Sequence, residues 1–297
     1  MYRLATTVLF AALLVATGGS PVHAQIYVDK DASGAGDGTS WTNAYTDLQT
    51  AIDNATASDE IWIAEGVYTP DGEGDSFTVT GAEDGLKIYG GFEGTESSRE
   101  QREPKSHRTI LSGDLNGDDT DPDGDGIIED ADDISGPNAH NVLFLDGTTA
   151  DGPITANTRV DGVIITAGQA DGSHPESAGG GLFCDGSGDA AHACSPTLRR
   201  VVVTGNRALG GGGGMANNGR NGGEASPTIT DAVFVGNNAP GVGGAMRNRG
   251  AGGAATPQLT NVVFAQNEAT GENFALGSGG AVANRATGQS GTPSLSI

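Results

Sequence analysis

Three twelve-residue stretches decide the fold: residues 195–206 read SPTLRRVVVTGN, residues 226–237 read SPTITDAVFVGN, and residues 256–267 read TPQLTNVVFAQN. A weaker copy of the central run, VIITAG, occupies residues 163–168. Each copy joins a turn signal to a short run of β-branched and aromatic residues, which is the pattern of a short strand between turns. The copies indicate a repeat architecture, because self-similarity at a period of about 30 residues is typical of stacked units.

A second motif separates the copies, reading GGMAN at 213–217, GAMRN at 244–248 and GAVAN at 280–284. The intervals are unequal, as expected where surface loops differ in length and the strands do not. No unit contains the ten-residue amphipathic pattern of a helical repeat such as a tetratricopeptide or ankyrin unit. A β-propeller is the alternative fold, but its blades need longer strands and about 40 residues or more.

Short strands of this kind predict a stack of coils. One turn cannot bury its own inward side chains, whereas coils stacked at about 4.8 Å bury a continuous core and satisfy the backbone ladder. We therefore expect an all-β protein, a parallel β-helix solenoid in which equivalent side chains lie above one another and buried amides bond to their neighbours. The residues expected in such columns are Phe234, Phe264, Asn206, Asn237, Asn267, Asn217, Asn248 and Asn284.

The Phe-x-x-Asn motifs at 234–237 and 264–267, with the Gly-Gly-Ala-apolar runs at 243–246 and 279–282, resemble the repeats of chlamydial-type polymorphic outer-membrane proteins. The resemblance extends over residues 140–297. Those relatives are right-handed β-helical surface proteins linked with adhesion, within the wider pectin-lyase-like superfamily. The resemblance implies a right-handed coil and a surface role.

The N-terminal third carries a different signal. Asp47 or the threonine before it is placed to cap a short helix with apolar residues on one face over 48–55, and such a helix would close the open end of a solenoid. The runs DGTSWTNAY at 37–45 and EGVYTP at 65–70 resemble the start of secreted bacterial right-handed β-helix proteins of uncharacterised function. Many of those proteins carry a C-terminal surface-sorting or anchor domain.

The first 24 residues predict export. Arg3 provides a positive n-region, residues 6–16 an apolar h-region, and residues 22–24 a small-x-small cleavage site, so we expect a signal peptide that is cleaved after Ala24. The expected location is the medium or the cell surface, with no transmembrane segment after cleavage.

The net charge of −23 excludes nucleic acid as a natural partner, because the chain would repel a polyanion. In an exported chain, Cys184 and Cys194 are expected to form a loop disulfide rather than a metal site, although a reduced pair is the alternative. The remaining partners are an extracellular glycan or a surface protein.

An acidic stretch between Asp114 and Asp133 has the spacing of a calcium loop. From Asp121 it reads DPDGDGIIEDAD, with carboxylates at positions 1, 3, 5, 9 and 12 and Gly126 at position 6. It resembles the calcium loops of dockerins and thrombospondin type-3 repeats, and a frame that starts at Asp119 fits as well. The ligands expected for a structural Ca²⁺ are Asp121, Asp123, Asp125, Ile127, Glu129 and Asp132, while Asp114, Asn116 and Asp118 could serve a second ion.

The functional expectation is a secreted or cell-surface, non-catalytic β-helix protein that is adhesive or binds glycans or proteins. The alternative is a calcium-dependent polysaccharide lyase or glycoside hydrolase, which would need an Arg or Lys base or paired carboxylates in one groove. Trp41 and Trp62 could form a sugar-stacking platform, but packing in a core or cap is the favoured interpretation.

The expected organisation has four parts. Residues 1–24 are the signal peptide, residues 25–100 are the cap with the first coils, residues 101–140 are the acidic insertion, and residues 141–297 are β-helix repeats. The last coil is expected to be truncated, because Thr292 begins a new copy that ends before its strand.

Overall fold

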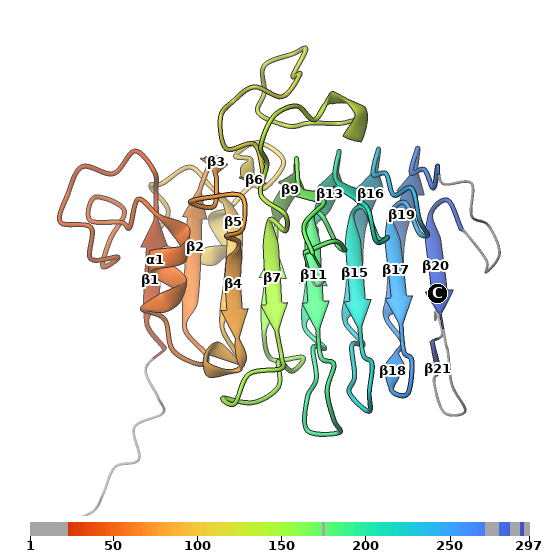
Figure 1. Cartoon of the computed structure of the whole chain (residues 1–297). Coiled ribbons are helices and arrows are strands. Elements are labelled where there is room, and N and C mark those ends of the chain that lie inside the picture. The colour runs from red at the N-terminus through yellow and green to blue at the C-terminus, as the bar shows by residue number, and fades with distance from the viewer. Residues whose placement is uncertain (1–22, 174–175, 271–278, 286–291, 294–297) are drawn as a thin grey trace, which may run out of the picture.

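The computed structural model describes residues 23–173, 176–270, 279–285 and 292–293. The chain is predominantly β, with parallel sheets and almost no helix (Figure 1). All pairings between named strands are parallel. Residues 1–22 of the predicted signal peptide and residues 294–297 of the last repeat copy lie outside the described residues.

Two large sheets run the length of the stack. The larger sheet contains β1 (Gln25–Val28), β2 (Glu60–Ala64), β3 (Gly66–Tyr68), β5 (Lys87–Phe92), β6 (Thr109–Ser112), β8 (Arg159–Asp161), β9 (Val163–Thr166), β12 (Thr197–Arg199), β13 (Val202–Thr204), β16 (Thr228–Val235) and β19 (Gln258–Ala265). The second sheet contains β4 (Phe77–Thr80), β7 (Leu143–Asp146), β11 (Leu182–Asp185), β15 (Met215–Asn218), β17 (Met246–Arg249) and β20 (Val282–Arg285).

Short elements complete the fold. Two pairs of two-residue strands are β10 (Gln169–Ala170) with β14 (Arg207–Ala208), and β18 (Ala254–Ala255) with β21 (Thr292–Pro293). The helices are α1 (Leu48–Asp53) and the 3-10 turns η1 (Gly81–Glu83), η2 (Arg99–Gln101) and η3 (Ala131–Asp133). None of the helices in the described residues has the length and apolar character that a membrane crossing requires.

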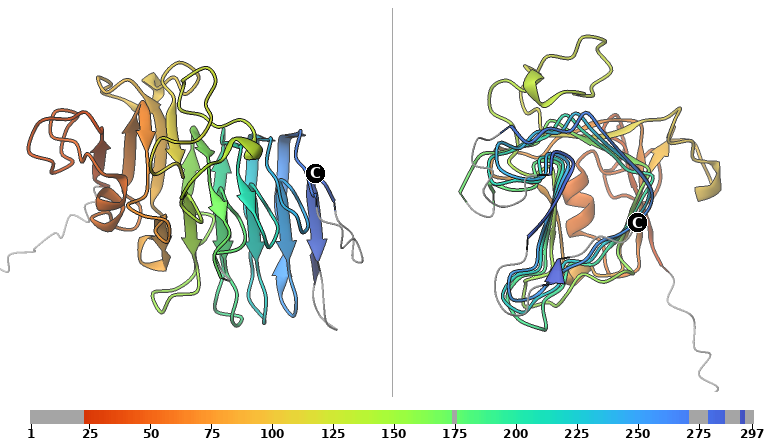
Figure 2. Two further views of the ribbon diagram at one scale, coloured as in Figure 1. Left: turned by 45° about the horizontal axis from the view of Figure 1, so that its top comes forward. Right: turned by 90° about the vertical axis from the view of Figure 1, so that its right-hand side faces the viewer.

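Successive repeat copies lie side by side in register. Leu182 pairs with Met215, Met215 with Met246, and Met246 with Val282, each in a parallel ladder. Viewed along the stack, the traces of these units overlie one another (Figure 2). Residues about thirty positions apart are therefore spatial neighbours across the described repeat region.

The core lies between the two large sheets and is built from inward-facing columns. Phe234 is fully buried above Val203, and its ring stacks on Phe264 with centroids 5.3 Å apart. Phe264 itself is only partly buried. The aromatic contact adds to apolar burial in the same column, so this column contributes strongly to stability.

Two columns of asparagine side chains mark the corners. Asn206 Nδ2 donates to Asn237 Oδ1 at 3.0 Å, and Asn237 Nδ2 donates to Asn267 Oδ1 at 2.8 Å. The amide of Asn237 also donates to the carbonyls of Val203 and Val235, so a buried polar group is satisfied by the backbone as well.

The second asparagine column lies on the other sheet. Asn217 donates to Asn248 at 2.7 Å, and Asn248 donates to Asn284 at 2.8 Å. Asn217 Oδ1 has no hydrogen-bond partner among the described residues, because its register neighbour in the preceding coil is Cys184 rather than another amide.

The N-terminal helix packs its apolar face on the first strands of the core, against β1 and β4. The Asp47 side chain accepts from Thr50 N at 2.6 Å and so caps α1, whose Leu48, Ala51 and Ile52 are buried. At the other flank of the core, Cys184 and Cys194 form a disulfide with Cα atoms 5.6 Å apart. The disulfide closes the loop after β11 against the next strand-forming segment.

Candidate functional site

A groove of about 880 Å³ crosses the outer face of the larger sheet. Its floor is a column of β-branched side chains, in which Ile164 on β9 pairs with Val202 on β13 and Val202 pairs with Val233 on β16. These residues point outward because they alternate along the strands with buried residues such as Val203. Packing of the core does not require these three residues to be apolar, because their side chains lie on the outer face of the sheet.

The apolar column extends beyond the groove at both ends. Val233 pairs with Val263, which is 51% exposed, and on the other side Ile164 pairs with Ile110, which pairs with Val67 at 38% exposure. Val67 and Val263 are two of the three large hydrophobic side chains that the described residues expose. Ile110 is itself only 3% exposed, so the partly exposed apolar row runs without a break only from Ile164 to Val263. Exposed apolar surface of this kind indicates a contact face.

One wall of the groove is a left-handed corner. Arg200, Asp231 and Asn261 occupy equivalent places in successive repeat copies, with φ angles of 50°, 56° and 53°. Asn261 Nδ2 donates to Asp231 Oδ1 at 2.7 Å, and this bond lowers the pKa of Asp231. The strained backbone therefore presents a row of polar side chains along the groove.

The other wall is the turn at residues 103–108. Glu103 N donates to Gly91 O at 2.7 Å, which holds the turn against β5. Pro104 lies against two glycines with positive φ, Gly91 and Gly162, and a Cβ built on Gly91 would stand 2.5 Å from Pro104 Cγ. Only glycine allows this approach, so the wall is fixed by residues from separate strands, because Gly91 lies on β5 and Gly162 lies between β8 and β9.

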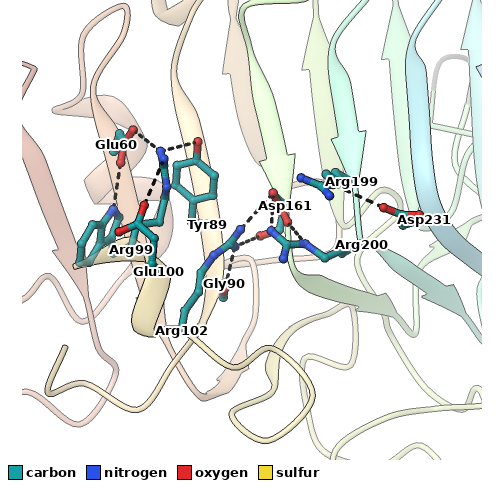
Figure 3. Close-up of polar contacts among 11 residues, drawn as sticks. Glu60, Tyr89, Gly90, Arg99, Glu100, Arg102, Asp161, Arg199, Arg200 and Asp231 are labelled. Atoms are coloured by element: carbon teal, nitrogen blue, oxygen red, sulfur yellow. Dashed lines mark hydrogen bonds and ion pairs between the residues drawn. The ribbon is translucent and has the colours of Figure 1, made fainter. Parts of the chain in front are cut away.

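A charged network holds the groove wall to the sheet (Figure 3). Asp161 is 1% exposed, and its carboxylate accepts hydrogen bonds from Arg200 Nε at 2.8 Å and from Arg200 Nη2 at 2.9 Å. Arg102 Nη2 lies 3.0 Å from the same carboxylate, and its guanidinium is centred 4.8 Å from the Tyr89 ring. Burial lowers the pKa of Arg102, whereas the hydrogen bond to Asp161 raises the pKa of Arg200.

The aromatic residues at the start of this face pack on one another. Trp62 is 4% exposed and stacks on Phe92 with centroids 4.7 Å apart, and Trp41 lies 5.5 Å from Phe92. Trp41 Nε1 donates to the Glu96 carbonyl at 2.9 Å. These rings pack in a cluster of their own and do not line the groove.

Residues 114–138 of the acidic insertion form a loop that projects from the stack (Figure 1), and Asp125 in this loop pairs with Arg108, which lines the groove. The structure brings Asp121, Asp123 and Asp125 together, with one carboxylate oxygen of each within 4.8 Å of the others. Asp121 accepts from Gly124 N and Gly126 N, both at 2.8 Å. Three of the six predicted calcium ligands thus form one cluster.

Of the other predicted ligands, Glu129 and Asp132 do not belong to that cluster among the described residues, and Ile127 follows it directly, with its N–H donating to Asp125 Oδ1 at 3.0 Å. The side chain of Ile127 is buried, and Ile128 N donates to Thr166 Oγ1 at 3.0 Å. These two contacts hold this part of the chain against the larger sheet. Glu129 is not part of the cluster, although burial and the charges of Asp123 and Asp125 raise its pKa. Asp132 belongs to η3, where its backbone N–H donates to Asp130 Oδ1.

A second acidic trio contains Asp114, Asp118 and Asp119. Asp119 accepts from Ser135 N at 2.6 Å and from Asn138 Nδ2 at 2.7 Å, and burial raises its pKa. Two of the residues expected to ligate a second ion, Asp114 and Asp118, belong to this trio. The third, Asn116, does not, and its backbone N–H donates to Asp114.

The sequence did not identify the groove or the network around Asp161. Its residues come from several repeat copies and one loop, and the only signal was the recurrence of outward β-branched residues at the Val202 position of each repeat. That signal could have been found by reading the polar and apolar alternation of the repeats for the outer face as well as for the core.

Comparison of the chain with protein-family models, with curated protein sequences and with solved structures finds no match in any of the three. Its function therefore has to be inferred from the geometry of the molecule itself.

Proposed function

We propose that this chain is an exported right-handed parallel β-helix that acts as a non-catalytic binding protein, and that its groove receives an extended segment of a partner protein. The observation that carries the proposal is the apolar column on the outer face, which runs from Ile164 to Val263 along the groove floor. Such a column offers evenly spaced contacts at about 4.8 Å to an extended chain.

The groove walls support a protein partner rather than a sugar. The side chains that line the groove include no aromatic ring on which a sugar could stack. The walls combine Lys105, Arg108 and Arg200 with Glu103 and Asp231, so both signs of charge are available beside an apolar floor. A hydrophobic centre with a polar rim is the usual composition of a protein-binding surface.

The alternative of a calcium-dependent lyase or glycosidase has weaker support. A lyase needs a cationic base that can approach the substrate, but Arg200 is engaged by Asp161 and Arg108 by Asp125. Lys105 lines the groove and is the cation on which an enzyme proposal would have to depend.

Panning a displayed peptide library on the purified protein tests the proposal. Val202→Asp places a charge on the groove floor, so we expect selected peptides to lose at least about ten-fold in affinity, which is 1.4 kcal/mol. Thr228→Glu, at an exposed position on β16 outside the groove lining, is the matched control and should leave affinity unchanged.

Three results would contradict the proposal. One is the failure to select any peptide, and another is equal loss of affinity in both variants. The third is calcium-dependent cleavage of a polyuronate that Lys105→Gln abolishes, which would favour the lyase.

We further propose that the acidic insertion binds a structural Ca²⁺ through Asp121, Asp123 and Asp125. Calcium prefers about six to eight oxygen ligands, and carboxylates this close repel one another without a cation. Arg108, paired with Asp125, is the neighbouring side chain that neutralises part of this charge. Bound Ca²⁺ would fix the insertion beside the groove.

Calcium is expected to raise the melting temperature, with half of the effect at about 10⁻⁴–10⁻³ M. Asp121→Asn should remove most of the calcium effect, because Asp121 is one of the three clustered carboxylates. Asp132→Asn should leave it intact if the cluster of three is the site. A larger loss from Asp132→Asn than from Asp121→Asn would instead favour the full EF-hand-like frame, and no response to calcium in the unmodified protein would contradict the proposal.

A further inference from the structure

A second cluster of metal-ligating side chains lies away from both the groove and the acidic insertion. Glu73, His140 and Asp171 each offer one ligand atom, and these atoms all lie within 4.8 Å of one another. The three residues come from segments far apart in the sequence. Unlike the acidic trios, this cluster contains an imidazole.

Backbone hydrogen bonds hold the three segments together. His140 N donates to Glu73 O at 2.8 Å, Gln169 N donates to Ala139 O at 2.9 Å, and Asp171 N donates to Gln169 O at 2.8 Å. The His140 side chain is only 15% exposed. The juxtaposition of the ligands therefore follows from the fold and does not depend on free surface loops.

The imidazole of His140 has carboxylates on both sides. Its Nδ1 lies 3.2 Å from Asp171 Oδ1 and 3.3 Å from the carbonyl of Gln169. Its Nε2 faces Gly172, where an added Cβ would stand 2.9 Å from both His140 Nε2 and Glu176 Oε2. Because Gly172 has no side chain, a small space remains between two potential metal ligands, His140 Nε2 and Glu176 Oε2.

The surroundings favour a cation. Gln169 Nε2 donates to Asp171 Oδ2 at 2.7 Å, while the buried Gln169 Oε1 has no hydrogen-bond partner among the described residues. A cavity of about 380 Å³ adjoins His140 and is also lined by Asp47, Asp71, Asp75 and Glu176, with no lysine or arginine among its lining residues. The four carboxylates of this cavity leave negative charge near His140 that a cation would neutralise.

We propose that Glu73, His140 and Asp171 bind a divalent transition metal of the zinc class, with Glu176 beside the site and one coordination position open to the cavity. Imidazole with carboxylates suits Zn²⁺ and Co²⁺, whereas Ca²⁺ prefers oxygen donors alone. Tetrahedral zinc ligands stand about 3.4 Å apart, which exposed Glu73 and Asp171 reach by side-chain rotation. The site differs from the calcium loop in its donor set.

Titration of the full chain with CoCl₂ and ZnCl₂ in excess CaCl₂ tests the site, because calcium then fills the acidic insertion. We expect a visible Co²⁺ spectrum with nitrogen coordination and displacement of Co²⁺ by Zn²⁺. His140→Gln should weaken Zn²⁺ binding at least about ten-fold. His107→Gln is the matched control, because His107 pairs with Glu65 at 2.8 Å but does not belong to any group of metal-ligating side chains among the described residues.

Melting curves of both variants without metal exclude misfolding as the cause of a loss. Asp171→Asn provides a second test, since it keeps the side-chain shape and removes the charge. Unchanged Zn²⁺ affinity in His140→Gln, an equal loss in His107→Gln, or displacement of Co²⁺ by Ca²⁺ would each overturn the proposal.

Discussion

Phe234→Ala is expected to lower the free energy of unfolding by about 3–5 kcal/mol, the largest single effect that we expect in the core. The ring is fully buried, stacks on Phe264 with centroids 5.3 Å apart, and pairs in register with Val203. Its removal would leave a cavity between two coils that the backbone ladder prevents from closing. Urea denaturation followed by circular dichroism measures the change.

Phe264→Ala is the matched control, because the same chemical change occurs one coil further along at a partly buried position. We expect it to reduce stability by about 1–2 kcal/mol, since less apolar area leaves water there. If the two variants lost stability equally, the Phe234 column would not be the continuous core that the register implies.

Asp161→Asn is expected to lower the free energy of unfolding by about 3–5 kcal/mol, because it leaves a buried guanidinium without its carboxylate. The side chain of Arg102 is 7% exposed and that of Asp161 is 2% exposed, so water cannot replace the lost charge. Thermal and urea unfolding of the variant give the change. The groove wall should also loosen, because Arg200 loses the same partner.

The control for this prediction is Arg99→Gln, which breaks the pair with Glu60 at side-chain exposures of 38% and 24%. A pair this exposed contributes about 0–1 kcal/mol. The double variant Asp161→Asn with Arg102→Met should recover part of the loss, because the uncompensated charge is gone. A double variant as unstable as the single one would show that the charge is not the cause.

The parallel packing of the repeats was predictable from the sequence, because it depends on a pattern that recurs in each copy. A Phe or Val at the position of Phe234 and an Asn at that of Asn237 return in each of the three clear repeat copies, and these residues lie in the hydrogen-bonded and stacked columns of the structure. The capping role of Asp47 also follows from local rules, since a side chain three residues from Thr50 N can reach it.

The charged network and the groove could not be predicted in the same way. Arg102 belongs to a loop outside the repeats, and its distance from Asp161 is set by the approach of Pro104 to Gly91 and Gly162. The sequence contains no pattern that links residues 59 positions apart in a non-repeating segment. Such contacts depend on the path of a loop, which local preferences do not fix.

The arrangement of the acidic insertion could be predicted from the sequence only in part. Its spacing predicted clustered carboxylates, and Asp121, Asp123 and Asp125 lie together. The spacing also places Asp132 with them, but Asp132 lies in η3 and does not belong to that cluster among the described residues. Between the two, Ile128 is 3% exposed and its N–H donates to Thr166 Oγ1, a contact with a distant strand that a local spacing rule does not encode.

Disulfide cross-linking tests most directly whether residues about thirty positions apart are neighbours. Val233 and Val263 pair in register on the outer face, so the double variant Val233→Cys, Val263→Cys should bring two Cα atoms to about 4.8 Å, within the 4.4–6.8 Å range of disulfides. We predict a cross-link between positions 233 and 263 of this variant in non-reduced peptide maps. We predict none for Val202→Cys, Val263→Cys, where the strands are about two spacings apart. Equal cross-linking in both variants, or cross-linking in neither, would contradict the stacked register.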